Sequence, residues 1–108
     1  MDTYFHGEVL ITKISKLPEG LKKVSAKDMK WIVADSENTG NHHCVKEADG
    51  VELYEKDGVL YMQNESPAEV FCVDTARHDT EIIPPGIWEI NRANEHDYLS
   101  DMTRKVAD

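Results

Sequence analysis

Short runs of alternating and β-branched hydrophobic residues recur along the chain at intervals of about ten residues. The runs expected to form strands cover residues 7–15, 30–35, 42–46, 51–56, 59–64, 68–73, 80–83 and 87–90. Turn-forming segments such as Leu17–Gly20 and Glu47–Gly50 lie between them. Strands do not alternate with helices in this pattern, which disfavours a parallel α/β sheet. We therefore predict an all-β fold, a small antiparallel sandwich or barrel of about seven or eight short strands.

The strongest local signal is the dipeptide Asp57-Gly58 between two alternating runs. A type I′ turn needs a positive φ at both central residues, and this dipeptide is one of the pairs that adopt it. We expect a tight hairpin here, with Tyr54 and Tyr61 close together on neighbouring strands. Trp31 and Trp88 lie in other hydrophobic runs and are candidate core residues.

A chain of 108 residues is long enough for one domain with its own core, and we assign residues 1–108 to a single β domain. Residues 1–6 are expected to form an N-terminal arm, residues 21–29 a lysine-rich connector, and residues 91–108 a polar C-terminal segment. The aromatic residues Tyr4, Phe5 and Tyr98 are candidates for contacts with a partner. For the two at the N-terminus, packing onto the chain's own sheet is the alternative.

The chain has a net charge of −9, which is spread unevenly. Residues 1–30 hold six lysines and four acidic residues, whereas residues 31–108 hold six basic and seventeen acidic ones. An acidic surface repels phosphate groups, so direct nucleic acid binding is disfavoured. The lysine-richer N-terminal third is suited to an acidic neighbour, including another copy of the chain. The more general interpretation is a charged surface that keeps the protein soluble.

Cys44 and Cys72 are the only cysteines, so at most one disulfide can form. The N-terminus has neither the basic region nor the apolar run of a secretory signal peptide. No apolar run approaches the roughly twenty residues of a membrane span. We expect a soluble protein that is not secreted by a signal peptide, has no membrane partner and keeps both thiols reduced.

Candidate metal ligands are concentrated after the turn-prone segment 36–41, where His42, His43 and Cys44 follow one another. His78 lies in a later polar corner. Zinc sites need three or four His, Cys or carboxylate ligands, and along an extended strand His42 and Cys44 point to one face and His43 to the other. We name these four residues as candidate ligands, with zinc as the candidate ion. The alternative is a histidine pair that anchors the turn beside a small core cysteine, with no cofactor.

Signatures of catalysis are missing from the sequence. A cysteine beside a histidine, as in His43-Cys44 or Cys72 with His78, is the minimum for nucleophilic catalysis. Such a pair also needs a third group that orients the histidine, and Cys72 lies in an apolar run where a buried inert thiol is the usual outcome. The chain has no phosphate-binding loop, triad motif or dinucleotide fingerprint. We expect that the protein is not an enzyme.

Taken together, these motifs resemble a family of small uncharacterised proteins of bacteriophages and bacterial genomes. The matching segments are residues 7–11, Leu17–Gly20, Glu37–His43 as a Glu-x-Thr-Gly-x-x-His motif, Arg77-His78, Pro85–Trp88, Glu95–Tyr98 and Val106–Asp108. Asn41 stands where the family has its first histidine, and the later corner keeps His78 alone of two. If the family binds a metal through four histidines, half of that ligand set is missing in this chain unless His42 or Cys44 substitutes. The resemblance implies a phage context and no particular activity.

Three hypotheses for the function follow from these observations. The first is a phage-encoded, non-enzymatic binding or assembly protein, a capsid-associated cement or decoration component whose partner is a capsid protein or another copy of the chain. The second is a histidine-based domain that binds a metal or small ligand and acts on a host pathway. The third is an acidic inhibitor that mimics nucleic acid. We expect the protein in the virion or the host cytoplasm.

Overall fold

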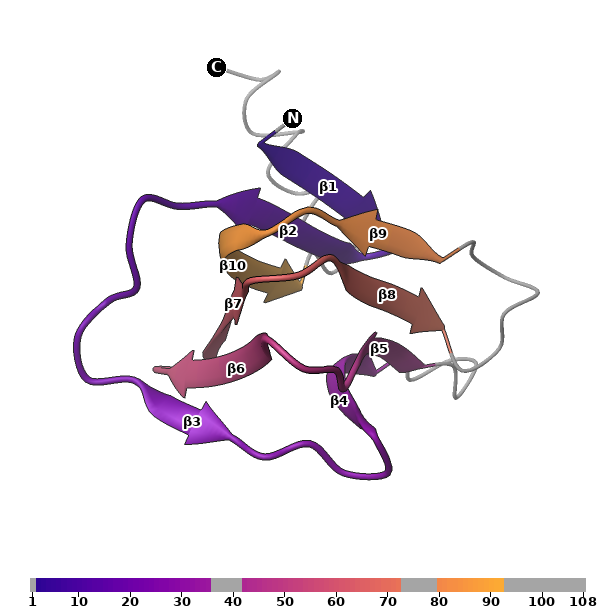
Figure 1. Ribbon diagram of the computed structural model, residues 1–108, viewed down its shortest axis with the longest axis horizontal. Helices are drawn as coiled ribbons and strands as arrows, with labels where there is room; N and C mark the ends of the chain where they lie inside the picture. The colour runs from indigo at the N-terminus through magenta and orange to yellow at the C-terminus, as the bar shows by residue number, and fades with distance from the viewer. Residues whose placement is uncertain (1, 36–41, 73–79, 93–108) are drawn as a thin grey trace, which may run out of the picture.

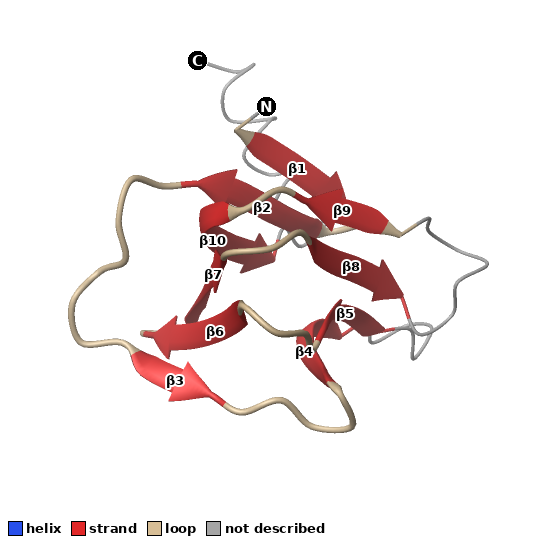
Figure 2. Ribbon diagram, in the orientation of Figure 1, coloured by secondary structure: helices blue, strands red, loops and turns tan. Residues whose placement is uncertain are grey.

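The computed structural model describes residues 2–35, 42–72 and 80–92, which form ten β-strands and no helix. The strands are β1 (Thr3–His6), β2 (Val9–Lys13), β3 (Lys22–Val24), β4 (Lys30–Asp35), β5 (His42–Lys46), β6 (Val51–Lys56), β7 (Val59–Asn64), β8 (Ala68–Cys72), β9 (Glu81–Ile83) and β10 (Gly86–Arg92). The predicted all-β fold is confirmed, and Figure 2 shows strands joined by loops and turns. Within these ranges there is accordingly no helix able to cross a membrane.

The strands form two antiparallel sheets that pack against each other (Figure 1). The six-stranded sheet has the order β1-β2-β10-β7-β6-β3, and the four-stranded sheet has the order β4-β5-β8-β9. Two sheets that bury their apolar faces against each other form a β-sandwich. Of the two architectures predicted, the sandwich is the one that the described residues adopt.

Two segments that we expected outside the sheets are strands, which is why the structure has more strands than predicted. Residues 3–6 of the predicted N-terminal arm form β1, an edge strand that pairs with β2. Gly7 makes this hairpin possible, because its φ of 60° lies in the left-handed region that glycine adopts readily. Lys22–Val24 of the predicted connector pair with β6 at the other edge. Of the predicted polar segment 91–108, Asn91 and Arg92 end β10 and residues 93–108 lie outside the described residues.

The hairpin predicted at Asp57-Gly58 is confirmed. Both residues have positive φ, at 51° and 80°, as a type I′ turn requires. The register pairs Tyr54 of β6 directly with Tyr61 of β7. A local signal was sufficient here because the turn type follows from two adjacent residues.

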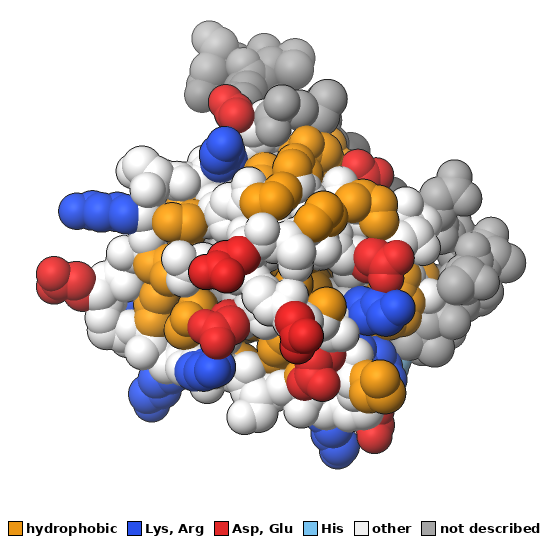
Figure 3. Space-filling view, viewed as in Figure 1, with side chains coloured by type: hydrophobic (Ala, Val, Ile, Leu, Met, Phe, Trp, Pro, Cys, Tyr) orange, Lys and Arg blue, Asp and Glu red, His pale blue; other side chains and the backbone are white. Residues whose placement is uncertain are grey.

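Charged side chains are spread over the face shown in Figure 3, where acidic and basic groups are interspersed with apolar and polar surface. Two exposed ion pairs join neighbouring strands, Lys23 with Glu52 at 3.1 Å and Lys46 with Glu69 at 3.4 Å. Exposed pairs of this kind contribute little to stability. In each pair a basic side chain lies beside the carboxylate, so Glu52 and Glu69 are not part of an uninterrupted row of acidic groups.

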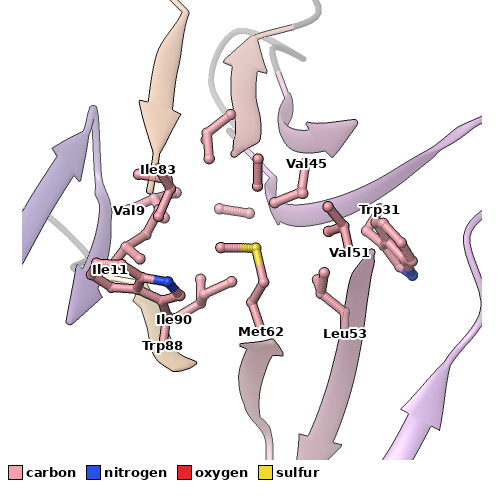
Figure 4. Packing of buried hydrophobic residues seen from close by; sticks show 13 residues of the cluster. Val9, Ile11, Trp31, Val45, Val51, Leu53, Met62, Ile83, Trp88 and Ile90 are labelled. Atoms are coloured by element: carbon pink, nitrogen blue, oxygen red, sulfur yellow. The ribbon is translucent and has the colours of Figure 1, made fainter. Parts of the chain in front are cut away.

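The space between the sheets is filled by a single hydrophobic cluster (Figure 4). Its buried members are Val9, Ile11, Trp31, Ala34, Val45, Val51, Leu53, Met62, Ala68, Val70, Ile83, Trp88 and Ile90. On most strands they come from alternate positions, as the two-residue period of a sheet requires. Trp31 and Ala34 of β4 are three residues apart, because the register of β4 with β5 shifts between Ile32 and Ala34. Both tryptophans that we expected in the core belong to it.

Asn64 is a buried polar side chain that ties the two sheets together. Its Oδ1 accepts a hydrogen bond of 3.0 Å from the indole of Trp88 on β10. Its Nδ2 lies within hydrogen-bond distance of the carbonyl oxygens of Ser66, Ile83 and Pro84, at 2.9, 3.2 and 3.1 Å. Because unpaired buried polar groups are costly, these partners explain why an amide is tolerated beside the core.

Candidate metal centre

Three side chains that can ligate a metal converge between the two sheets. They are His6 at the end of β1, His43 on β5 and Cys72 at the end of β8. The two Nδ1 atoms of the histidines lie 2.9 Å apart, and Cys72 Sγ lies 3.4 Å from the same Nδ1 of His43. All three ligand atoms lie within 4.8 Å of one another.

The local sequence explains why these side chains point into the sandwich. His43 alternates with Val45, and Cys72 alternates with Val70, and both valines belong to the core. His43 and Cys72 are also direct partners in the register of β5 and β8. The third member comes from the other sheet, where the turn at Gly7 ends β1 at His6.

The cluster is buried as well as compact. The exposed fractions of His6, His43 and Cys72 are 3%, 4% and 0%. The two imidazole rings meet nearly at right angles, with an interplanar angle of 89° and ring centroids 5.0 Å apart. Ring planes set in this way direct both Nδ1 atoms to a common region instead of stacking the rings.

The distances within the cluster fit one small ion. A triangle with sides of 2.9 and 3.4 Å and a third side of at most 4.8 Å has a centre no more than about 2.4 Å from each corner. Zinc–nitrogen and zinc–sulfur bonds are about 2.1 and 2.3 Å long. An ion at that centre would therefore reach all three ligand atoms with little displacement of the side chains.

The geometry does not match a cysteine–histidine catalytic triad. In a triad, the nucleophile contacts one ring nitrogen of the histidine and the orienting group holds the other. Here Cys72 and His6 both approach Nδ1 of His43. Three ligand atoms this close together are able to bind one metal ion.

The ligands named from the sequence are divided by the structure. His43 is in the cluster, whereas His42 and Cys44 are its neighbours on β5 and alternate to the opposite face of the strand. Cys44 is fully buried, and its Sγ lies 3.8 Å from the carbonyl oxygen of His42. His78 lies outside the described residues.

His6 was missed as a ligand by the sequence reasoning, and Cys72 was considered only as a nucleophile beside His78 or as a buried inert thiol. The residues that bring His6 into place were visible in the sequence, because Gly7-Glu8 separates two runs by the two residues of a tight hairpin. Pairing of His43 with Cys72 had no such signal, since it depends on a register between strands 29 residues apart.

The three residues named as partner contacts also differ in their surroundings. Tyr4 packs its ring edge against Trp88, with centroids 5.5 Å apart, so it supports the core. Phe5, the next residue of β1, points the other way and is 66% exposed. Tyr98 lies outside the described residues.

Two neighbouring side chains at the surface, Glu52 and Tyr54, have pKa values shifted from their ordinary values. The hydroxyl of Tyr54 donates a hydrogen bond of 2.6 Å to Glu52, which also pairs with Lys23. The bond from Tyr54, followed by the contact with Lys23, lowers the pKa of the Glu52 carboxyl. The same bond raises the pKa of the Tyr54 hydroxyl. These shifts belong to the β3–β6 edge of the six-stranded sheet and not to the metal cluster.

Comparison with known proteins defines the family of the chain. Residues 5–93 match the family described as Domain of unknown function (DUF8820), and the chain belongs to that family. The match begins within β1, continues through β10 and includes all three members of the cluster. No curated protein and no solved structure matches the chain. The family resemblance expected from the sequence is therefore correct at the level of an uncharacterised domain family.

Proposed function

We propose that the protein is a transition-metal-binding β-domain that holds one Zn²⁺ ion through His6, His43 and Cys72. The single observation that supports this most strongly is the approach of two further ligand atoms to Nδ1 of His43, at 2.9 and 3.4 Å. Imidazole nitrogen and thiolate sulfur together are a ligand set that zinc prefers. Carboxylate-binding ions such as Mg²⁺ are disfavoured at a site without oxygen ligands among these three residues.

The origin of the ligands indicates what the ion would do. His6 belongs to the six-stranded sheet, while His43 and Cys72 belong to the four-stranded sheet. An ion bound by all three joins the edge strand β1 to the opposite layer of the sandwich. Since such a site forms only in the folded protein, the binding free energy adds to the stability of the fold.

Zinc titration of the metal-free protein tests the proposal. We expect one equivalent to bind, measured by calorimetry and by the mass of the intact complex. Cys72→Ser should weaken zinc binding by at least about tenfold, because a serine hydroxyl is a poor zinc ligand. Cys44→Ser is the matched control, since Cys44 is equally buried but faces the other side of β5.

The two cysteine variants also distinguish the ligand set of the structure, which includes Cys72, from the set predicted from the sequence, which includes Cys44. If Cys44→Ser loses zinc and Cys72→Ser keeps it, the ion is held on the other face of β5 and the present proposal is wrong. If neither variant changes the affinity, the cluster is a set of buried hydrogen bonds without a metal.

A second candidate is the assembly protein expected from the sequence, encoded by a phage and associated with the capsid, in the virion or the host cytoplasm. The supporting observation is that three edge strands each carry an exposed apolar residue, Phe5 on β1, Ile32 on β4 and Ile82 on β9. Edge strands and exposed apolar side chains are both suited to protein contacts. Cosedimentation with purified virions tests this candidate, and a protein that stays monomeric and apart from virions would contradict it.

A further inference from the structure

The open edge of β4 borders a hollow that is separate from the metal cluster. The hollow has a volume of about 270 Å³ and lies between the β3–β4 segment, β4 and the inner side of β6 and β7. Its apolar lining includes Val24, Trp31, Leu53 and Leu60. At the lower right of Figure 3, hydrophobic, basic and acidic side chains lie close together. The hollow is open to solvent at this end of the sandwich and is not an enclosed cavity.

The backbone of β4 is arranged to pair with another strand along the open edge beside this hollow. Within the sheet, β4 pairs with β5 alone. The N–H of Glu47 bonds to the carbonyl of Met29, whereas the N–H and carbonyl of Lys30 bond to Lys27 on the side away from β5. Because backbone direction repeats every two residues along a strand, the N–H and carbonyl of Ile32 also point to the open edge.

The turn before β4 exposes an apolar residue to solvent. Asp28 and Met29 have φ values of 55° and 64°, an unfavourable conformation for residues other than glycine. The paired bonds between Lys27 and Lys30 close this turn. Met29 is left 73% exposed, close in sequence to the half-exposed Ile32. Strained turns of this kind are found more often at functional sites than elsewhere.

Charge decides between the occupants of the hollow. Lys27 and Lys30 line it with one acidic residue, Asp28, and neither lysine forms an ion pair with a described residue. The chain as a whole carries −9. Two lysines against one carboxylate therefore favour an acidic occupant at this edge.

We propose that this edge binds an extended acidic peptide segment of another protein. The segment adds a strand along β4, with backbone bonds to Ile32, apolar side chains in the hollow and carboxylates on Lys27 and Lys30. This inference does not rest on the metal centre, because the two sites share no residue.

The test uses the full chain and two labelled synthetic peptides, Glu-Val-Glu-Ile-Glu-Val and its lysine counterpart, with binding followed by fluorescence anisotropy at low salt. We expect the glutamate peptide to bind at least about tenfold more tightly, and this preference to fall as salt rises. The double variant Lys27→Glu, Lys30→Glu should reverse the preference. Equal binding of the two peptides, or no binding of either, would overturn the proposal.

A backbone variant tests the added strand separately from the charge. Ile32→Pro removes an N–H that points to the open edge, so it should leave the β4–β5 pairing and zinc binding intact but abolish peptide binding. Retained peptide binding in a folded Ile32→Pro protein would contradict strand addition. Should this variant not fold, the lysine variants still decide the question. A dimer in sedimentation that is lost in the lysine variants would assign the edge to a second copy and overturn the proposal.

Discussion

His43 and Cys72 face each other as direct partners on the neighbouring antiparallel strands β5 and β8. Side chains in such a pair start from Cβ atoms about 5 Å apart, which is within reach of a shared ion. The sheet register therefore sets two of the three ligands before any metal binds. His6 completes the set from the other layer of the sandwich.

Zinc should stabilise the protein and protect β1 in particular. With free zinc at a hundred times its dissociation constant, the free energy of unfolding should rise by about 2.7 kcal/mol. Hydrogen exchange of the β1 amides should slow when zinc is added, because His6 then ties the edge strand to the other sheet. In His6→Gln, zinc should leave both the melting temperature and the β1 exchange unchanged. A full zinc effect in that variant would show that His6 is not a ligand.

The β1–β2 turn should control zinc affinity through the position of His6. Gly7→Ala places a side chain at a φ of 60°, which costs about 1–2 kcal/mol and displaces the end of β1. We expect a loss of stability together with weaker zinc binding in calorimetry.

Gly58→Ala is the matched control for this substitution. It puts the same strain into the β6–β7 turn at a φ of 80°, where a Cβ would meet no atom within 4 Å. This variant should lose comparable stability but keep its zinc affinity. If both variants weaken zinc binding equally, the effect is general destabilisation and not the placement of His6.

Asn64 should be among the most sensitive polar positions in the described structure. Asn64→Ala leaves the indole N–H of Trp88 and the carbonyl of Ile83 without this partner in a buried setting. We expect a loss of about 2–3 kcal/mol in denaturant unfolding. A double-mutant cycle with Trp88→Phe should show a coupling of at least about 0.5 kcal/mol. Additive effects of the two substitutions would contradict the hydrogen bond between them.

The Glu52–Tyr54 pair predicts a pH dependence at each end of the scale. The pKa of Glu52 is lowered in the folded state. Its contribution to the free energy of unfolding is therefore present above the unfolded carboxyl pKa and is lost as pH falls through the folded value. The pKa of Tyr54 is raised, so its contribution is present below the unfolded pKa and is lost as pH rises through the folded value.

Ultraviolet titration of the tyrosines measures this shift. We expect a component with raised pKa in the native protein that disappears in Glu52→Gln and in Tyr54→Phe. Glu55→Gln, on the same strand, should leave it in place. Persistence of the raised component in Tyr54→Phe would assign it to another tyrosine.

The parts of the fold that follow from adjacent residues could be predicted from the sequence. Alternation identified most strands, and Asp57-Gly58 identified both the hairpin and the pairing of Tyr54 with Tyr61. The same hairpin logic applied to Gly7-Glu8 would have found β1, but the run before it is only four residues long and was assigned to an N-terminal arm. The strand β3 carries two lysines in three residues and has no apolar pattern of its own.

The candidate site was harder to predict because it depends on contacts between distant residues. Periodicity correctly separates His43 from His42 and Cys44 on β5, but it does not reveal which face of the strand meets other ligands. That depends on the pairing of β5 with β8 and on the arrangement of the two sheets. The adjacent residues His42-His43-Cys44 therefore drew attention to one strand, whereas the cluster takes one residue from each of three strands.

The most direct measurement of the metal centre is the absorption spectrum of the protein loaded with Co²⁺ in place of Zn²⁺. We predict an intense thiolate-to-cobalt charge-transfer band, together with visible bands of a low-coordinate ion, at one equivalent of metal. The charge-transfer band should disappear in Cys72→Ser and remain in Cys44→Ser. A spectrum without a thiolate band, or a band that depends on Cys44 instead of Cys72, would contradict metal binding by His6, His43 and Cys72.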